Sequence, residues 1–132
     1  MQAHGHFNMY REGRLLICQP MGAFNLSGAM AYEQQFKEVV APLLGAPWGI
    51  VELTEEFEAA GPDVIERFNR QFHWCAANGC DFMAVVMPEQ GFRRYMANQM
   101  LADVPFIECR YFDDAASAIA WLQSALSKCD AR

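Results

Sequence analysis

Hydrophobic residues along the chain follow two kinds of pattern, one typical of strands and one typical of helices. The two patterns alternate, which predicts alternating strands and helices. Unbroken apolar runs at residues 15–18 and 82–86 are typical of strands covered on both faces. Apolar positions three or four residues apart, such as Tyr32, Phe36 and Val40, are typical of helices that bury one face. The chain therefore combines strands and helices in regular order.

The order of these elements predicts the fold class. Strands are expected at residues 7–10, 14–19, 48–53, 82–87 and 106–112, with Pro20 and Gly22 ending the second. Helices are expected from Asn25 or Ser27 to about residue 44, at 62–77, at about 90–101, and from Asp113 or Asp114 to a frayed tail at 127–132. We predict a single α/β domain over residues 1–132. Its mixed sheet has about five strands, an N-terminal antiparallel hairpin and then parallel strands, with about four helices.

Composition and charge narrow the class of function. A net charge of −6 disfavours nucleic-acid binding, because such proteins use Lys and Arg to neutralise phosphates. The N-terminus shows no signal-peptide pattern and no apolar run is long enough to span a bilayer, so we expect a cytoplasmic protein. The five Cys residues are expected to be reduced, and mostly buried.

Three segments carry a resemblance to a known family. They are residues 22–25 (Gly-Ala-Phe-Asn) before the first helix, residues 78–81 (Asn-Gly-Cys-Asp) between helix and strand, and the closing strand and Ala-rich helix at 111–122. In order and spacing they resemble the STAS domain, the fold of anti-sigma-factor antagonists such as SpoIIAA. The resemblance covers nearly the whole chain and implies a SpoIIAA/STAS-like sheet with helices on it.

One departure from that family concerns its phosphorylation segment. Phosphorylated STAS antagonists carry Asp-Ser-Ser/Thr-Gly between the third strand and the second helix, whereas residues 54–63 are acidic and contain no Ser. Thr54 is their one hydroxyl, and a phosphate near Glu55, Glu56 and Glu58 would be repelled. The chain is more similar to the small SpoIIAA-like bacterial proteins labelled STAS/SEC14. That resemblance implies a non-polar ligand or a membrane contact, because SEC14-type relatives bind lipids.

The candidate ligand-binding residues lie where the carboxyl ends of parallel strands should meet, since ligands settle at that edge. They are Phe57, Phe92, Tyr95, Met96, Met100, Trp74, Arg93 and Arg94. On the helix expected at 90–101, an apolar arc edged by arginines suits a lipid interface, an acidic ligand or a protein groove. Alternatively, this helix covers the sheet and its two arginines are solvated. Phe57 either packs on the core or is an exposed anchor, and Trp74 either covers a neighbouring side chain or anchors a partner.

Three function hypotheses follow from these residues. The first is a non-enzymatic binding module for a non-polar small molecule or a membrane surface. The second is a protein-interaction regulator of the antagonist type, without serine phosphorylation, and the third is a small enzyme that uses Glu55 and Glu56. No cofactor or metal is expected, because His73, Cys75 and Cys80 fit no common zinc spacing. An apolar arc without a ligand also favours a homodimer.

Overall fold

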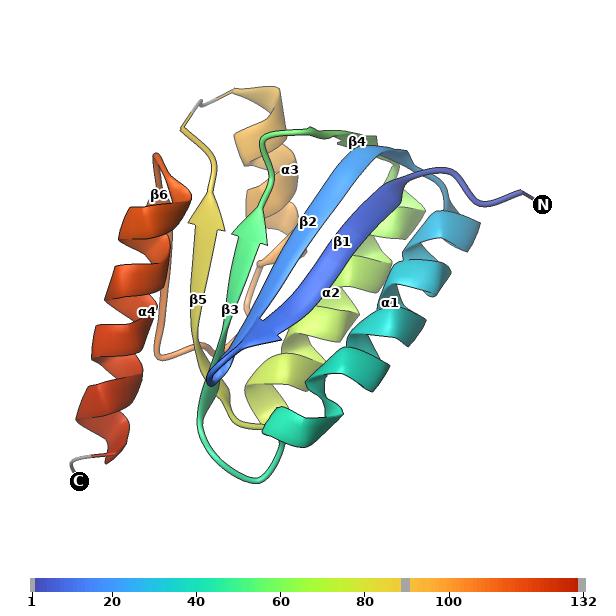
Figure 1. Ribbon diagram of the computed structural model, residues 1–132. Helices are drawn as coiled ribbons and strands as arrows, with labels where there is room; N and C mark the ends of the chain where they lie inside the picture. Colours follow the sequence, from blue (N-terminus) through green and yellow to red (C-terminus); the bar gives the residue numbers. More distant parts are fainter. Residues whose placement is uncertain (1, 89–90, 131–132) are drawn as a thin grey trace.

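The computed structural model describes residues 2–88 and 91–130, and its elements alternate as the sequence predicts (Figure 1). The strands are β1 (His6–Glu12), β2 (Leu15–Phe24), β3 (Trp48–Leu53), β4 (Phe57–Ala60), β5 (Cys80–Val86) and β6 (Glu108–Phe112). The helices are α1 (Leu26–Val40), the short 3-10 helix η1 (Ala41–Leu43), α2 (Pro62–Ala77), α3 (Phe92–Met100) and α4 (Ala115–Asp130). No described helix is both long enough and apolar enough to cross a bilayer.

The sheet is mixed, as predicted. Its main path runs β1-β2-β3-β5-β6, with β1 antiparallel to β2 and the other neighbours parallel. The hairpin turns at Gly13, whose φ of +59° lies in the left-handed region that glycine adopts without strain. The predicted N-terminal hairpin followed by parallel strands is therefore confirmed.

The structure has a sixth strand, β4, which the sequence did not predict. Two predictions are therefore wrong: the acidic loop after the third strand, and the end of the second strand at Pro20 or Gly22. The segment expected as an acidic loop folds back from Phe57 as β4, which pairs in parallel with the last residues of β2. β2 therefore continues to Phe24 and does not end at Pro20 or Gly22, because β4 gives its last residues a new partner. The Gly22 N–H donates to the Glu56 carbonyl at 2.8 Å where this pairing begins.

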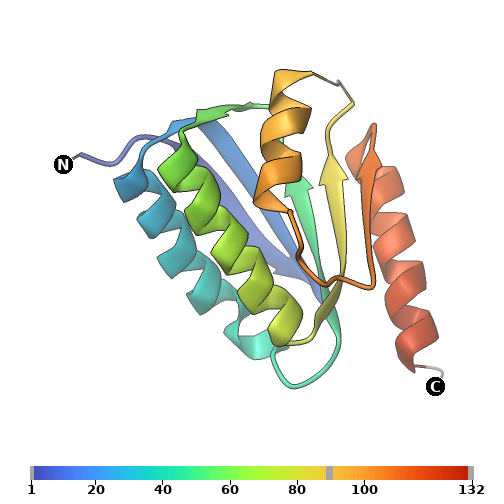
Figure 2. The same ribbon diagram turned by 180° about the vertical axis from the view of Figure 1, so that it is seen from behind.

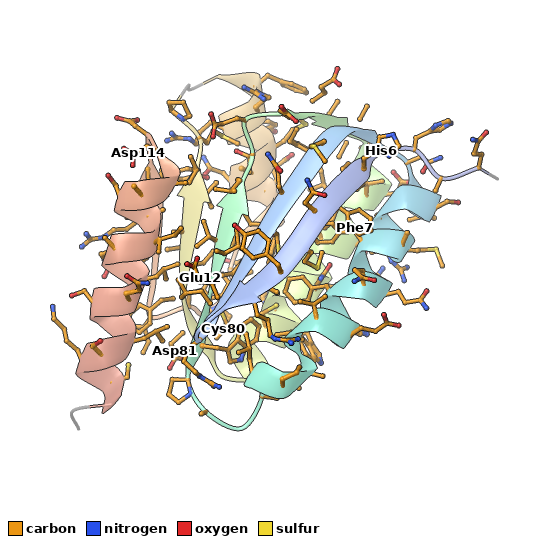
Figure 3. All side chains as sticks on the ribbon, viewed as in Figure 1. His6, Phe7, Glu12, Cys80, Asp81 and Asp114 are labelled. Atoms are coloured by element: carbon orange, nitrogen blue, oxygen red, sulfur yellow. The ribbon has the colours of Figure 1, made fainter. Side chains whose placement is uncertain are left out.

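Helix ends follow the capping signals in the sequence. Asn25 is the cap of α1, where its side chain accepts a hydrogen bond from the Gly28 N–H at 2.8 Å. Asp114, at the start of α4 in Figure 3, accepts from the Ser117 N–H at 2.7 Å. The fraying expected from Ser127 is wrong as far as Asp130, where α4 ends, and residues 131–132 lie outside the described part. The expected start of the third helix, at Gln90, also lies outside it.

The sheet separates two apolar layers. Helices α1, α2 and α3 cover one face and α4 covers the other (Figures 1 and 2). Alternate side chains of each strand therefore enter different layers, so that Leu16 and Cys18 face α1 and α2 while Leu15 and Ile17 face α4. The inner strands β2, β3 and β5 are covered on both sides, which explains their mostly apolar sequences.

The α4 layer depends on close packing between Leu122 and Gly49. A Cβ added at Gly49 on β3 would lie 3.1 Å from Leu122 Cδ2, so the leucine fills space that a side chain would otherwise occupy. Leu122 is fully buried, and α4 is the helix that covers this face in the described part of the chain.

Leu122→Ala should lower the free energy of unfolding by about 2–5 kcal/mol, because it leaves a cavity against the sheet. The neighbouring Gln123 is exposed, so Gln123→Ala should change stability by less than about 0.5 kcal/mol. Urea denaturation followed by circular dichroism measures both values. Equal losses in the two variants would contradict this packing.

Candidate functional site

Arg93 and Arg94 of α3 donate hydrogen bonds to backbone carbonyls near the ends of β3 and β5. Arg93 Nη1 donates to the carbonyl oxygens of Glu55 at 3.0 Å and Phe57 at 2.6 Å, between β3 and β4. Arg94 Nη2 donates to the Met87 carbonyl at 2.7 Å, and its guanidinium lies 3.6 Å from the centre of the Tyr111 ring. The alternative in which both arginines are solvated is therefore wrong.

The expected apolar arc of α3 divides into an inner and an outer face. Met96 and Met100 are buried, with 1% and 9% of their surface exposed. Phe92 and Tyr95 are 69% and 58% exposed, and their rings stack with centroids 6.5 Å apart. The reason is that α3 lies with only one side against α2 and the sheet, so positions on the other side face outward. Ligand binding by these residues remains a prediction.

Phe57 belongs to the core. It is buried and its ring centroid lies 6.1 Å from that of Phe24. The residue begins β4, and the alternation of side chains along a strand turns it inward while Glu58 is exposed. The option of Phe57 as an exposed anchor is therefore wrong.

A small cavity of about 50 Å³ lies beneath α3, between this helix, α2 and the sheet. Its walls are mostly aromatic rings and methionines, including Phe72, Met83 and Met100. Two polar side chains, Glu52 and Thr54, also line it, and both come from β3 or the residue just beyond it. The cavity thus lies near the carboxyl ends of the parallel strands, where the sequence analysis placed the site.

Glu52 is the acidic side chain in the wall of this cavity. It is 5% exposed, and Tyr32 Oη on α1 donates to its Oε1 at 2.6 Å. Burial raises the pKa of Glu52 to about 8, although the hydrogen bond from Tyr32 acts in the opposite direction. The carboxyl therefore carries a proton near neutral pH. Glu52 is not among the candidate residues predicted from the sequence, although it is the single acidic residue inside the otherwise apolar strand 48–53.

The buried thiols of Cys18 and Cys75 lie near this carboxyl. Cys18 on β2 is the register partner of Glu52, and Cys75 and Cys80 are also buried. Burial raises the pKa of all three thiols, so they are protonated and unreactive near neutral pH. All five cysteines are free, as expected, although Cys109 and Cys129 are only partly buried.

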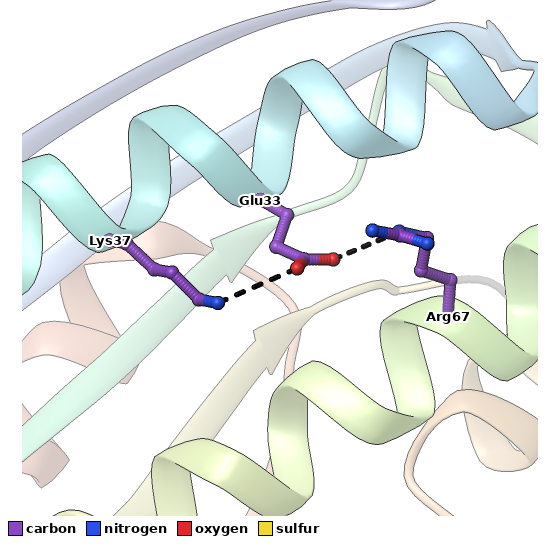
Figure 4. A network of polar contacts seen from close by, with 3 residues as sticks. All are labelled: Glu33, Lys37 and Arg67. Atoms are coloured by element: carbon purple, nitrogen blue, oxygen red, sulfur yellow. Dashed lines mark hydrogen bonds and ion pairs between the residues drawn. The ribbon is translucent and has the colours of Figure 1, made fainter.

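Trp74 lies in a different place, at a surface hollow between α1 and α2. It is half-buried and packs against the core. Next to it, Glu33 on α1 pairs with Lys37 at 3.6 Å and with Arg67 on α2 at 3.0 Å (Figure 4). Gln71 on α2 is buried there, because α1 covers this side of α2. The structure therefore does not bring Trp74 together with the residues of α3.

The acidic residues proposed for catalysis lie outside the cavity. Glu55 and Glu56 are exposed and neither lines its wall. The described residues also contain no group of three or more His, Cys, Asp or Glu side chains placed to hold a metal ion. The arrangement offers a protonated carboxyl in an apolar cavity and an aromatic outer surface, both organised by α3.

Comparisons with known proteins identify the fold. No family model matches the chain, and no curated protein matches it by sequence. An uncharacterized protein of the DUF3478 family with a SpoIIAA-like fold, from Shewanella loihica PV-4, superposes with a TM-score of 0.63 at 14% identity, over 92% of this chain and 96% of the other. An anti-sigma factor antagonist from Mycobacterium paratuberculosis gives 0.60 at 12% identity, over 91% and 95%. The chain has a SpoIIAA-like fold, as the resemblance in its sequence implies.

The free energy of unfolding should fall as the pH rises from about 4.5 to about 8, because of Glu52. The unfolded state releases the proton near the ordinary pKa of 4.5, whereas the folded state keeps it until about 8. The stabilisation is therefore complete below the lower value and is lost as the pH passes the upper one. Urea denaturation at a series of pH values measures this slope.

Glu52→Gln should flatten this slope, because glutamine does not titrate. Glu38 on α1 is exposed, so Glu38→Gln is the matched control and should keep the slope of the unchanged protein. If Glu52→Gln and Glu38→Gln gave the same slope, Glu52 would not be the group responsible.

Proposed function

We propose that this protein is a non-enzymatic regulatory module that binds a partner protein through the outer face of α3. The observation that carries the proposal is the exposed, stacked pair of Phe92 and Tyr95. Aromatic side chains are enriched in protein interfaces and among the residues that contribute most to binding. The similar fold of an anti-sigma factor antagonist supports a partner of this class.

The position of this aromatic pair supports the same proposal. Arg93 and Arg94, between Phe92 and Tyr95 in the sequence, hold α3 against backbone carbonyls of the β3–β4 connection and of Met87. A helix held at both points presents its outer side chains in a fixed place. Binding then costs less conformational entropy than ordering a free loop would.

A protein partner fits the structure better than a lipid or a membrane. The cavity, at about 50 Å³, is much smaller than the ~150 Å³ cavity that holds one benzene molecule, so an acyl chain has no room in it. The two arginines at the edge of the arc donate to backbone carbonyls of this chain. We retain the cytoplasmic location and the absence of a cofactor as parts of the proposal.

Photo-crosslinking in the native host tests the proposal directly. Phe92→p-benzoylphenylalanine places the reactive group on α3, and the same replacement of Tyr10, which is 53% exposed on β1, is the matched control. We expect one defined crosslinked partner from position 92 and none from position 10. Adding Tyr95→Ala to the position-92 variant should reduce the yield severalfold, because a buried interface aromatic is worth about 2 kcal/mol or more.

Three results would overturn the proposal. They are no crosslink at position 92, equal yields from both positions, and a yield that Tyr95→Ala leaves unchanged. A crosslink only to a second copy of this chain would also overturn it, in favour of the homodimer.

A further inference from the structure

We infer that the cavity beneath α3 is a binding site for a small uncharged molecule with an apolar body and one hydrogen-bond acceptor, held by the carboxyl of Glu52. This site is separate from the outer face of α3, so the inference does not depend on the proposed partner. It rests on the hydrogen bonding, the charge and the size of the cavity.

The hydrogen bonding of Glu52 is incomplete within the described chain. Tyr32 Oη donates to Oε1, and the other carboxyl oxygen has no partner among the described residues. The second polar side chain of the cavity, Thr54, is 8% exposed and its hydroxyl is engaged, since Oγ1 donates to the Val86 carbonyl at 2.8 Å. Because Glu52 lines the cavity, a ligand inside it is placed to complete the bonding of this carboxyl.

The direction of that missing hydrogen bond follows from the proton on Glu52. Because Tyr32 donates to Oε1, the acid proton of Glu52 belongs on the other oxygen, which acts as a donor. The ligand must then offer an acceptor such as a carbonyl, ether or hydroxyl oxygen.

The groups around Glu52 favour an uncharged ligand. The titratable side chains nearest to it are Tyr32 on α1, Cys18 on β2 and Cys75 on α2, and burial raises the pKa of each. All three are therefore neutral near pH 7. A charged ligand would find no opposite charge among these groups and would lose its hydration in an apolar cavity.

The size and walls of the cavity restrict the ligand further. A volume of about 50 Å³ accepts a few non-hydrogen atoms, and a larger molecule requires α3 to move outward. Met83, Met87 and Met100 line the wall, and unbranched methionine side chains adapt their shape readily. The class that fits is a small ketone, ether or alcohol. A cavity that holds water alone is the competing outcome.

Methionine methyl groups report on this site in the intact protein. We would label the methyls with ¹³C, titrate acetone at pH 6, and follow Met83, Met87 and Met100 by NMR. Met30 on α1 is 48% exposed and serves as the internal control for solvent effects. Isobutene is the matched probe, because it has the shape of acetone without the acceptor oxygen.

The inference requires saturable shifts at the three cavity methionines with acetone, tighter binding than isobutene, and no saturable shift at Met30. At pH 9.5 the affinity for acetone should fall at least about tenfold, because Glu52 has then lost its proton. Glu52→Gln, which keeps a neutral donor, should bind acetone equally at both pH values. Absence of saturable shifts, equal binding of the two probes, or an equal pH effect in Glu52→Gln would overturn the inference.

Discussion

Parallel pairing of β2, β3, β5 and β6 is the constraint on which the candidate site depends. Parallel strands run in the same direction, so their carboxyl ends lie at one edge of the sheet. At that edge, β3 leads to β4 and β5 leads to α3. Residues far apart in the sequence thus meet, and Arg93 reaches the carbonyl of Glu55.

Helix α3 has one face in the core and the other on the surface. Met96 and Met100 face inward, and Met100 forms part of the wall of the cavity that holds Glu52. Phe92 and Tyr95 face outward from the same nine-residue helix. Since both pairs belong to one short helix, a ligand that pushed α3 outward would also move the aromatic pair.

Sequence patterns located the helix of the site but not the roles of its side chains. The periodicity at residues 92–100 identifies an amphipathic helix, yet it leaves Arg93 and Arg94 either at the edge of a binding surface or solvated. Their actual partners are backbone carbonyls from other elements. Phe57 could have packed inward or outward until β4 paired with β2. Glu52 was not predicted as a site residue. Its burial and its hydrogen bond from the Tyr32 hydroxyl both depend on segments that are distant in the chain.

The sequence alone determined the alternation of strands and helices, the hairpin, the candidate helix caps and the α/β fold class. Those features depend on local preferences and on the period of hydrophobic residues, which a single chain displays directly. Only the tertiary structure decided that Glu52 is buried and protonated, that β4 extends the sheet, and which side chains of α3 reach the surface. These depend on which distant segments pack together, because burial and hydrogen-bond partners arise between elements and not within them.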